Sequence, residues 1–512
     1  MLSKKLYLRP IRYLALIIAA TATLSCQQGR KNNSWVASFP YLGTNSSPRL
    51  ADLTADGVPD IVLGSGRNEW EASDSAVIAL DGADGHLLWH AAAPNQVVGS
   101  ALFLDISADS VPDVIIGGRS TFLSAIDGRM GTVLWKYAPP QDSSGAGRFA
   151  HHNFYSPQLI ADQTGDGLPD LLVPNGGNPR ALANSSAGRD PGVLMILNSQ
   201  TGAILSVAAM PDGQETYCSP LVHDFEQSGN PEVIFGTGGE TAGGGLYRVP
   251  LADVVKGDLS GAKQLWMAPG HGFIAPPVLA DVTADGIADI IATNQGGILL
   301  AFDGKDNHLL WKVEVPGAEA SSSIAVGYFN RDETPDFFAP FSLGVWPENN
   351  GARQMFVDGR DGQILHEYSA GCTGFFSPVA VDLDQDGLDE VLMSVNEYRC
   401  DGIFVTDSEH YIGLFQPKDG SLSAFIPRQS SKNLSSTPWI GDMDRDGYLD
   451  IVYVLQANTA RIIDFAGMAV LRQEFRHRVS TPPSWGGYMG NKGDGTFRGS
   501  PAEATLRRRS GS

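Results

Sequence analysis

The sequence predicts an all-β fold, an eight-bladed β-propeller of four-stranded blades, from three observations. A short acidic pattern recurs eight times along the chain, roughly every 55 residues. Short runs of branched apolar residues flank each copy, and glycine is frequent, with 59 residues, which is typical of short strands joined by turns. Eight four-stranded units in a row would leave open sheet edges, and closing them into a ring protects those edges.

The clearest copy of the acidic pattern is GDMDRDGYLDIV at 441–452. Counted from Asp442, carboxylates stand at positions one, three, five and nine, and glycine stands at position six. The other copies keep part or all of this pattern and span Asp52–Asp60, Asp105–Asp113, Asp162–Asp170, Asp224–Glu232, Asp281–Asp289, Tyr328–Asp336 and Asp382–Glu390. Apolar runs before and after each copy make it the tight connection between two strands.

A second hairpin follows the acidic one in most repeats. Two strand-like runs surround a DG-type turn and end in tryptophan in segments 77–89, 123–135 and 298–311. The turn persists without the tryptophan in 194–206 and 354–366, and the pattern is fainter in 411–425 and 461–475. The fourth repeat is irregular here, although Trp266 stands where a closing tryptophan is expected. Each repeat therefore supplies four strands.

Two resemblances support this reading. The acidic half of the repeat resembles the FG-GAP repeat of integrin-α-type propellers. The second half resembles the PQQ-like propeller repeat, whose pattern A-x-D-x-x-T-G-x-x-x-W is matched by Ala79, Asp81, Gly85 and Trp89, with Asp84 in place of the threonine. Both resemblances imply the fold, and neither implies an activity.

The acidic loops are predicted calcium sites. Side-chain oxygens at this spacing, with a glycine for the sharp turn, resemble a shortened EF-hand loop, and hard oxygen ligands favour Ca²⁺. The predicted ligands are Asp382, Asp384, Asp386 and Glu390; Asp442, Asp444, Asp446 and Asp450; Asp52, Asp56 and Asp60; Asp162, Asp166 and Asp170; and Asp281, Asp285 and Asp289. The alternative is that aspartate simply caps these turns. Catalysis by the loops is disfavoured, since catalytic carboxylates converge once rather than eight times.

Strand alternation sorts the loops between two faces of the ring. The acidic loops and DG turns share one face, here called the acidic face, and the blade connections and inter-hairpin links share the other, here called the second face. Longer loops on a rigid scaffold are the usual place for binding, so a glycan or protein ligand is expected on the second face. The candidate residues there are Trp70, His152, Tyr155, Tyr217, His271, Trp346 and Tyr398.

The N-terminus reads as an export signal. A positive stretch precedes a short apolar run at 13–24, which is too short to span a bilayer comfortably. Thr23-Leu24-Ser25-Cys26 resembles a bacterial lipobox with Cys26 as the lipidated residue, and ordinary cleavage after Ala22 is the alternative. The expected organisation is a signal peptide at 1–25, a polar tether at 26–33, the propeller at 34–495 and a disordered tail at 496–512.

If Cys26 carries lipid, three cysteines remain. An exported protein meets an oxidising compartment, which favours one disulfide and one free thiol. Cys372 and Cys400 flank one acidic hairpin on the second face and are the expected pair, with Cys218 as the rival partner. At the ends of the ring, either the segment around Trp35 or the one around Trp485 is expected to complete a blade across the seam.

The composition argues against one class of partner and leaves two hypotheses for the function. The formal net charge is −21, and no basic stripe is present, so nucleic acid is not an expected partner. The leading hypothesis is a calcium-stabilised binding, adhesion or scaffold module of the bacterial cell envelope, on the outer membrane or cell surface, that meets the membrane only through its lipid anchor. The alternative is a polysaccharide lyase or other carbohydrate-active enzyme. No PQQ is expected, because the adjacent cysteine pair familiar from quinoprotein dehydrogenases is missing.

Overall fold

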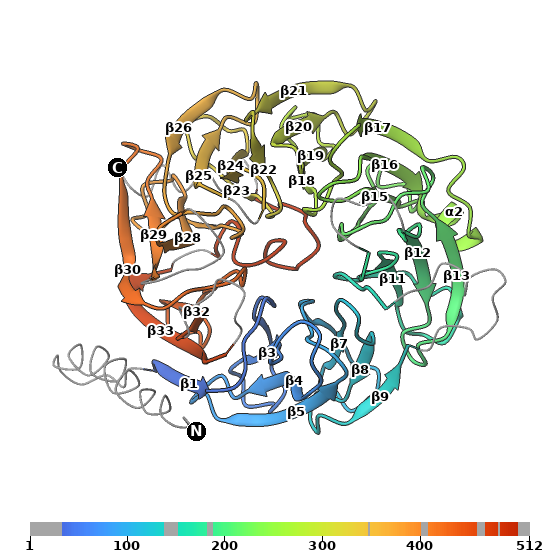
Figure 1. Cartoon of the computed structure of the whole chain (residues 1–512), viewed down its shortest axis with the longest axis horizontal. Helices are drawn as coiled ribbons and strands as arrows, with labels where there is room; N and C mark the ends of the chain where they lie inside the picture. The colour runs from blue at the N-terminus through green and yellow to red at the C-terminus, as the bar shows by residue number, and fades with distance from the viewer. Residues whose placement is uncertain are drawn as a thin grey trace, which may run out of the picture.

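The computed structural model describes residues 33–137, 152–181, 188–346, 349–400, 408–457, 466–479 and 482–499. Within these residues, eight antiparallel sheets are arranged in a ring, so the predicted all-β eight-bladed propeller is confirmed (Figure 1). Each blade is one sheet, and in all blades but the eighth its strands come from one continuous stretch of the chain.

The strand bounds follow the repeats closely. Blades 1 and 2 contain β2 (Arg49–Ala51), β3 (Asp60–Gly64), β4 (Ser73–Leu80), β5 (Leu87–Ala93), and β6 (Leu102–Leu104), β7 (Asp113–Ile116), β8 (Ser124–Ile126), β9 (Val133–Lys136). Blades 3 and 4 contain β10 (Gln158–Ile160), β11 (Asp170–Asn175), β12 (Val193–Leu197), β13 (Ile204–Ala209), and β14 (Leu221–His223), β15 (Glu232–Gly236), β16 (Gly244–Pro250), β17 (Lys263–Ala268).

The second half of the ring continues the same order. Blades 5 and 6 contain β18 (Val278–Ala280), β19 (Asp289–Asn294), β20 (Ile298–Phe302), β21 (Leu309–Glu314), and β23 (Ala325–Gly327), β24 (Asp336–Leu343), β25 (Gly351–Val357), β26 (Ile364–Tyr368), with β22 (Ala318–Glu319) added to the sixth sheet. Blades 7 and 8 contain β27 (Val379–Val381), β28 (Glu390–Glu397), β29 (Glu409–Phe415), β30 (Leu422–Ser430), and β31 (Trp439–Gly441), β32 (Tyr448–Gln456), β33 (Met468–Arg478), β1 (Trp35–Phe39).

The N-terminal strand closes the ring. Strand β1 pairs with β33, from Trp35 opposite Arg472 to Phe39 opposite Met468, and so supplies the outer strand of blade 8. Within the faint second hairpin expected at 461–475, the described residues contribute the strand β33, whose outer partner is β1 from the other end of the chain, and residues 461–465 lie outside the described residues. Because β1 leads directly into blade 1, this pairing ties the first and last blades together and leaves no open sheet edge at the seam.

Indole groups link neighbouring blades on the acidic face. The indole N–H of Trp89 donates to the carbonyl of Gly128 in the next blade at 2.7 Å, and Trp311 donates to Gly359 at 2.7 Å. The equivalent bond across the ring seam runs from Trp35 to Gly82 at 3.0 Å. In blade 4 the short helix α2 (Leu251–Lys256) stands in place of a DG turn, which explains the irregular fourth repeat.

The C-terminal segment 482–499, here called the plug, lies inside the ring against the inner strands. Trp485 pairs through both backbone bonds with Ala380 of β27, at 2.9 and 3.0 Å. Further along, the carbonyl of Gly495 accepts from Leu279 of β18, and Phe497 donates back to Leu279. Figure 1 shows this segment in red inside the ring. The described chain thus stays in contact with inner strands up to Phe497.

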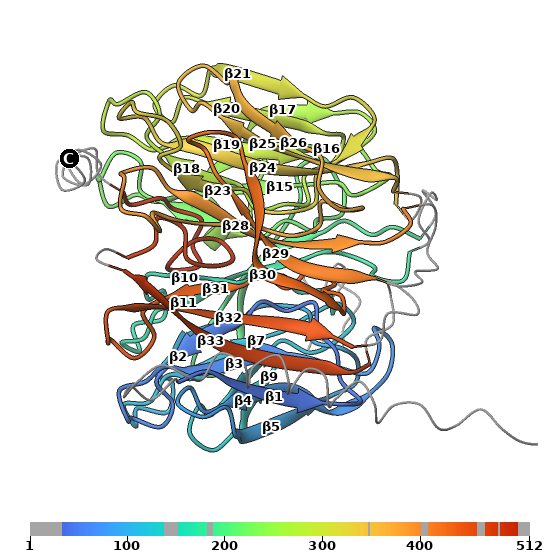
Figure 2. The same cartoon turned by 90° about the vertical axis from the view of Figure 1, so that its left-hand side faces the viewer.

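The two faces carry different loops, as Figure 2 shows from the side. The acidic loops join the first and second strands of each blade, and the DG turns join the third and fourth, so both lie on one face. Blade connections and inter-hairpin links lie on the other face. Among the described residues, no helix is long and apolar enough to cross a membrane.

Candidate functional site

The ninth carboxylate of the acidic loops is a buried structural group. In blade 1, one oxygen of Asp60 accepts from the backbone N–H groups of Leu53 and Thr54 at 2.8 and 3.0 Å, and the other accepts from Gly82 in the DG turn at 2.9 Å. Burial raises the pKa of Asp60 against these bonds. Asp113, Asp289 and Asp336 make the same three contacts in blades 2, 5 and 6. This carboxylate therefore joins the two hairpins of its blade.

Earlier positions of the loop satisfy the loop's own backbone. Asp52 accepts from the N–H groups of Asp56 and Gly57 at 3.2 and 3.0 Å, and Asp56 accepts from Val58 at 2.8 Å. Asp281 and Asp285 repeat this arrangement, and Asp162 and Asp166 follow it closely. These bonds are the aspartate-capped turn that was the alternative to calcium.

Only two acidic loops gather three carboxylates within the described residues. In loop seven, ligand oxygens of Asp382, Asp384 and Glu390 lie within 4.8 Å of one another. In loop eight, Asp442, Asp444 and Asp450 do the same, and Asp446 joins Asp444 and Glu474 in an overlapping group. The predicted ligands of loops one, three and five form no such group in the described part of the chain.

Loop eight already contains an internal cation. Arg472, whose side chain is 1% exposed, donates to Asp450 at 2.9 Å and to Asp444 at 2.7 Å. Its third contact is the carbonyl of Gly82 in blade 1, at 3.0 Å. In blade 4, Arg248 pairs in the same way with Glu232 and the carbonyl of Gly304 in blade 5. A guanidinium thus already pairs with two of the four carboxylates that loop eight was expected to offer to Ca²⁺.

Loop seven fits a calcium ion best. Oxygens within 4.8 Å of one another are compatible with Ca–O distances of about 2.3–2.6 Å. Burial, together with Asp384, Asp382 and Asp386, raises the pKa of Glu390 to about 8, and a divalent cation would relieve that crowding. Asp386 is less available to a calcium ion, because Lys418 pairs with it at 2.8 Å.

Loop seven gives a pH prediction. With a chelator, the folded chain holds a proton on Glu390 at pH values where the unfolded chain, with a glutamate pKa of 4.5, has released it. Stability from this group should therefore fall as pH rises from about 5 to about 8. Calcium binds the ionised form, so saturating calcium should flatten this part of the melting-temperature profile. Glu390→Gln should flatten it without calcium, and identical slopes with and without calcium would contradict a site in loop seven.

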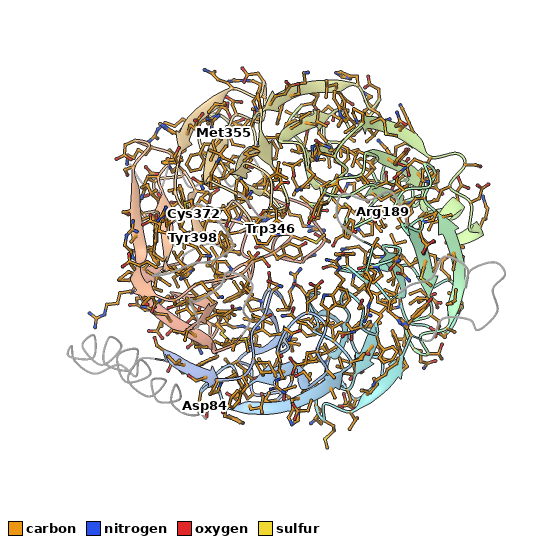
Figure 3. All side chains as sticks on the ribbon, in the orientation of Figure 1. Asp84, Arg189, Trp346, Met355, Cys372 and Tyr398 are labelled. Atoms are coloured by element: carbon orange, nitrogen blue, oxygen red, sulfur yellow. A yellow bond between two sulfur atoms is a disulfide. The ribbon has the colours of Figure 1, made fainter. Side chains whose placement is uncertain are left out.

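Two DG turns contain groups of side chains that could hold a metal ion and that were not predicted from the sequence. Asp81, Asp84 and His86 in blade 1 and their counterparts Asp303, Asp306 and His308 in blade 5 each bring three ligand atoms within 4.8 Å. The carboxylate of Asp84 lies 2.6 Å from Nδ1 of His86 and accepts its hydrogen bond, which raises the pKa of His86. The signal was the spacing D-G-x-D-x-H in both turns. Asp84 lies at the outer rim of the ring (Figure 3), and its exposed setting favours a turn-capping role.

Side chains from several blades lie close together on the second face. We call this group the mouth, and its residues are Trp70, Arg119, Tyr155, Arg189 and Tyr217. Arg119 of blade 2 pairs with Glu69 of blade 1 at 3.2 Å, and its guanidinium lies 5.7 Å from the ring centroid of Trp70. The rings of Tyr155 and Tyr217 meet edge-on at 5.8 Å. Tyr155 and Tyr217 both interact electrostatically with Arg119, although burial is the larger influence on their raised pKa values.

An ion pair is buried in the same region. Arg189 pairs with Glu215, whose side chain is 1% exposed, and also donates to Thr241 at 3.4 Å. Burial raises the pKa of Glu215, and Arg189 acts in the opposite direction. Figure 3 shows Arg189 and Trp346 turned towards the centre of the ring from different blades. Arg119 and Glu215 were not among the predicted candidates, because each is a single charged residue in a short polar loop.

The other predicted second-face residues have structural contacts. The Nδ1 of His271 lies 2.7 Å from the carbonyl of Glu240, and the backbone N–H of Trp346 donates to Glu319 at 2.9 Å. His152 lies in an aromatic cluster, 5.2 Å from Phe122. His152 is therefore a packing residue, and His271 and Trp346 are predicted residues that contact the neighbouring second-face groups Glu240 and Glu319.

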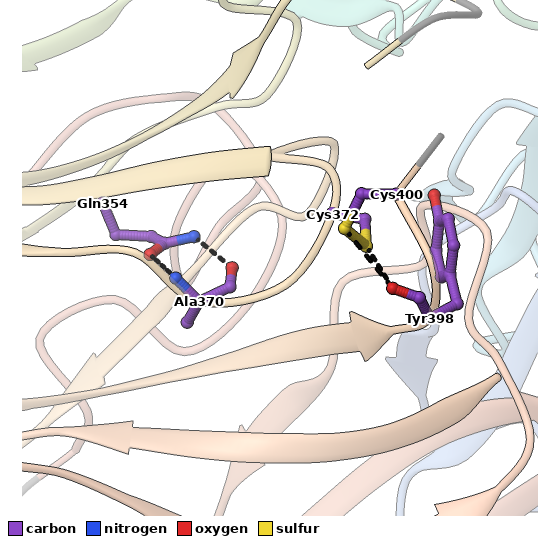
Figure 4. Close-up of a disulfide and its surroundings, with 5 residues drawn as sticks. All are labelled: Gln354, Ala370, Cys372, Tyr398 and Cys400. Carbon is purple, nitrogen blue, oxygen red and sulfur yellow. Dashed lines mark hydrogen bonds between the residues drawn. A yellow bond between two sulfur atoms is a disulfide. The ribbon is translucent and has the colours of Figure 1, made fainter. Parts of the chain in front are cut away.

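A disulfide braces this face. Cys372 and Cys400 are bonded, with Cα atoms 5.2 Å apart, and Cys218 is a buried free thiol. The carbonyl of Tyr398 lies 3.0 Å from the sulfur of Cys372 (Figure 4). Gln354 exchanges two bonds with the backbone of Ala370 beside it. The connection between blades 6 and 7 is thus held at two points, and Tyr398 is part of this brace.

Sequence comparison adds a partial family match. A family model described as outer membrane protein assembly factor BamB matches residues 51–168. This stretch covers blades 1 and 2 and the start of blade 3 and carries the PQQ-like pattern, so the chain is a β-propeller scaffold with PQQ-like repeats. The FG-GAP resemblance stays a prediction.

Relatives and solved structures agree on the scaffold. The chain is 23% identical to FAM234B of Gallus gallus over 386 residues, which is 68% of this chain and 56% of the relative, and 23% identical to FAM234B of Homo sapiens over 485 residues, or 85% and 71%. It therefore spans little more than half the length of the chicken protein. Quinohemoprotein alcohol dehydrogenase ADHIIG from Pseudomonas putida HK5 has a TM-score of 0.54 at 11% identity, covering 88% of this chain and 77% of its own. Rhamnogalacturonan lyase YesX has 0.50 at 14%, covering 85% and 75%. Such likeness concerns the fold alone.

Proposed function

We propose that this chain is a ligand-binding propeller whose binding site is the mouth on the second face. The observation that carries the proposal is convergence, since Trp70, Arg119, Tyr155, Arg189 and Tyr217 come from separate loops of the first four blades and lie in one interacting group. A rigid scaffold that gathers aromatic and charged groups from many loops is typical of a binding site.

The chemistry of the mouth suits a polar ligand such as a glycan or a polypeptide. Burial raises the pKa of Tyr217 to about 12 and holds that of Tyr155 well above its ordinary value, so both hydroxyls remain protonated donors at neutral pH. The tyrosine hydroxyls can also accept hydrogen bonds. The acidic face has the opposite character, because its carboxylates are already bonded to their own loops.

We further propose that the protein is exported and lipid-anchored through Cys26, with calcium in loop seven and a place at the cell envelope. Cys26 and the signal sequence lie outside the described residues. The Cys372–Cys400 disulfide supports an oxidising compartment. The curated relatives named above come from chicken and human, so the bacterial assignment depends on the lipobox alone.

A glycan array combined with a pull-down tests the binding site. Tyr155→Ala and Tyr217→Ala should each weaken binding of any recovered ligand at least tenfold. Tyr41→Ala is the matched control, because Tyr41 is 76% exposed and follows the outer strand β1. Binding that survives both mouth variants would refute the assignment, and new unsaturated sugar ends on a bound polyuronide would favour the lyase alternative.

A further inference from the structure

We infer that the mouth binds an acidic saccharide, with a sugar carboxylate held by Arg119 and Arg180 beside Trp70. This inference rests on the proposed function and names its ligand class. Three loops contribute to the group, namely the inter-hairpin links of blades 1, 2 and 3.

Two guanidinium groups share one indole ring. Arg180 lies 5.0 Å from the ring centroid of Trp70, and Arg119 lies 5.7 Å from it. Arg119 also donates to the carbonyl of Pro179 at 2.7 Å, which ties the link carrying Arg180 to blade 2. The two cations are thus held near each other by contacts that do not use their full hydrogen-bonding capacity.

The local charge is incompletely balanced. Glu69 pairs with Arg119. Among the described residues, no carboxylate lies within ion-pair distance of Arg180, and its exposed side chain faces solvent beside Trp70. Arg119 also interacts electrostatically with Glu240, so Arg180 is the guanidinium of this pair that is left without a paired carboxylate among the described residues. A planar guanidinium matches a carboxylate in two-point geometry, which gives an anionic ligand both energy and orientation.

The neighbouring groups favour a sugar over an acidic peptide. Tyr155 and Tyr217 supply hydroxyl groups next to Arg119, and a hydroxyl group can both donate to and accept from a saccharide. Peptide ligands usually insert apolar or aromatic anchors into pockets. Here the cations lie over the Trp70 ring and the two tyrosines are packed edge-on against each other, so these aromatic groups leave little room for such an anchor.

Calorimetric titration with oligogalacturonate tests this inference on the full chain. Binding should weaken at least tenfold when the sugar carboxylates are methyl-esterified, and should weaken similarly in Arg180→Gln. Arg67→Gln is the matched control, because Arg67 is exposed in the same link as Trp70 and already pairs with Glu71 at 3.3 Å. Affinity for the acidic form should also fall as salt is raised.

Three results would overturn the inference. They are equal affinity for the esterified and free oligosaccharides, unchanged affinity in Arg180→Gln, and equal affinity for oligoglutamate, which would indicate an acidic peptide. A neutral glycan that depends on Tyr155 but not on Arg180 would leave the proposed binding site intact and refute only the ligand class. Melting temperatures of the variants identify any that fail to fold, and the esterified ligand tests the unmodified protein.

Discussion

Arg472→Met should lower the free energy of unfolding by about 3–5 kcal/mol, the usual cost of removing one partner from a buried ion pair. Asp450 is fully buried and Asp444 nearly so, and both accept from this guanidinium. Methionine fills a similar space but leaves the two carboxylates without their cation. The bond to Gly82 is lost as well, and that bond joins blade 8 to blade 1 across the seam. The measurement is the shift in urea-denaturation midpoint.

Arg129→Met is the matched control for this effect. Arg129 also pairs with an acidic-loop carboxylate, Asp109, at 3.0 Å, but its side chain is 48% exposed, so its loss should cost less than about 1 kcal/mol. Calcium should stabilise Arg472→Met more than the unmodified protein, since the vacated carboxylates of loop eight then resemble those of loop seven. A loss in Arg472→Met no larger than in the control would contradict the internal-cation account.

Trp485→Ala should destabilise the protein by about 3–5 kcal/mol, as is typical for a buried aromatic residue. Trp485 is 1% exposed, packs in the core of blades 5 to 7, and holds the plug against β27 through paired backbone bonds. The substitution removes packing between the plug and the inner strands. It also weakens the attachment of a segment that contacts several blades.

Trp70→Ala serves as the control, because Trp70 is 41% exposed and should change stability by less than about 1 kcal/mol. Thermal unfolding followed by tryptophan fluorescence and circular dichroism measures both variants. Equal melting temperatures for Trp485→Ala and the unmodified protein would show that the plug does not support the ring.

Repetition made the fold predictable, and long-range pairing made the rest hard to see. Eight copies of one loop fix the strand pairs because both flanks repeat with the loop. Ring closure depends on which terminus reaches blade 8, and the segments at Trp35 and Trp485 both looked suitable. The structure uses the first as a strand and the second as a plug, and nothing local to either segment separates these roles.

The acidic loops show the same limit at the level of single residues. Loop eight has the same full set of four carboxylates as loop seven, yet two of them pair with Arg472 on a neighbouring strand. A charged residue inside the apolar run MAVLRQEF was the available signal, and Arg248 inside GGLYRVP repeats it in blade 4. At the mouth, residue type identified Tyr155 and Tyr217, but only their spatial convergence with Arg119 separates them from His152, which packs in an aromatic cluster.

The most direct test of the account is hydrogen–deuterium exchange of the full chain with and without a saturating ligand from the glycan screen. Ligand binding at the mouth should slow exchange in three second-face links, 65–72, 117–123 and 176–181, and at Tyr217. Exchange in the acidic loops should stay unchanged. Protection confined to the acidic loops, with none at the mouth, would contradict the assignment of function to the second face.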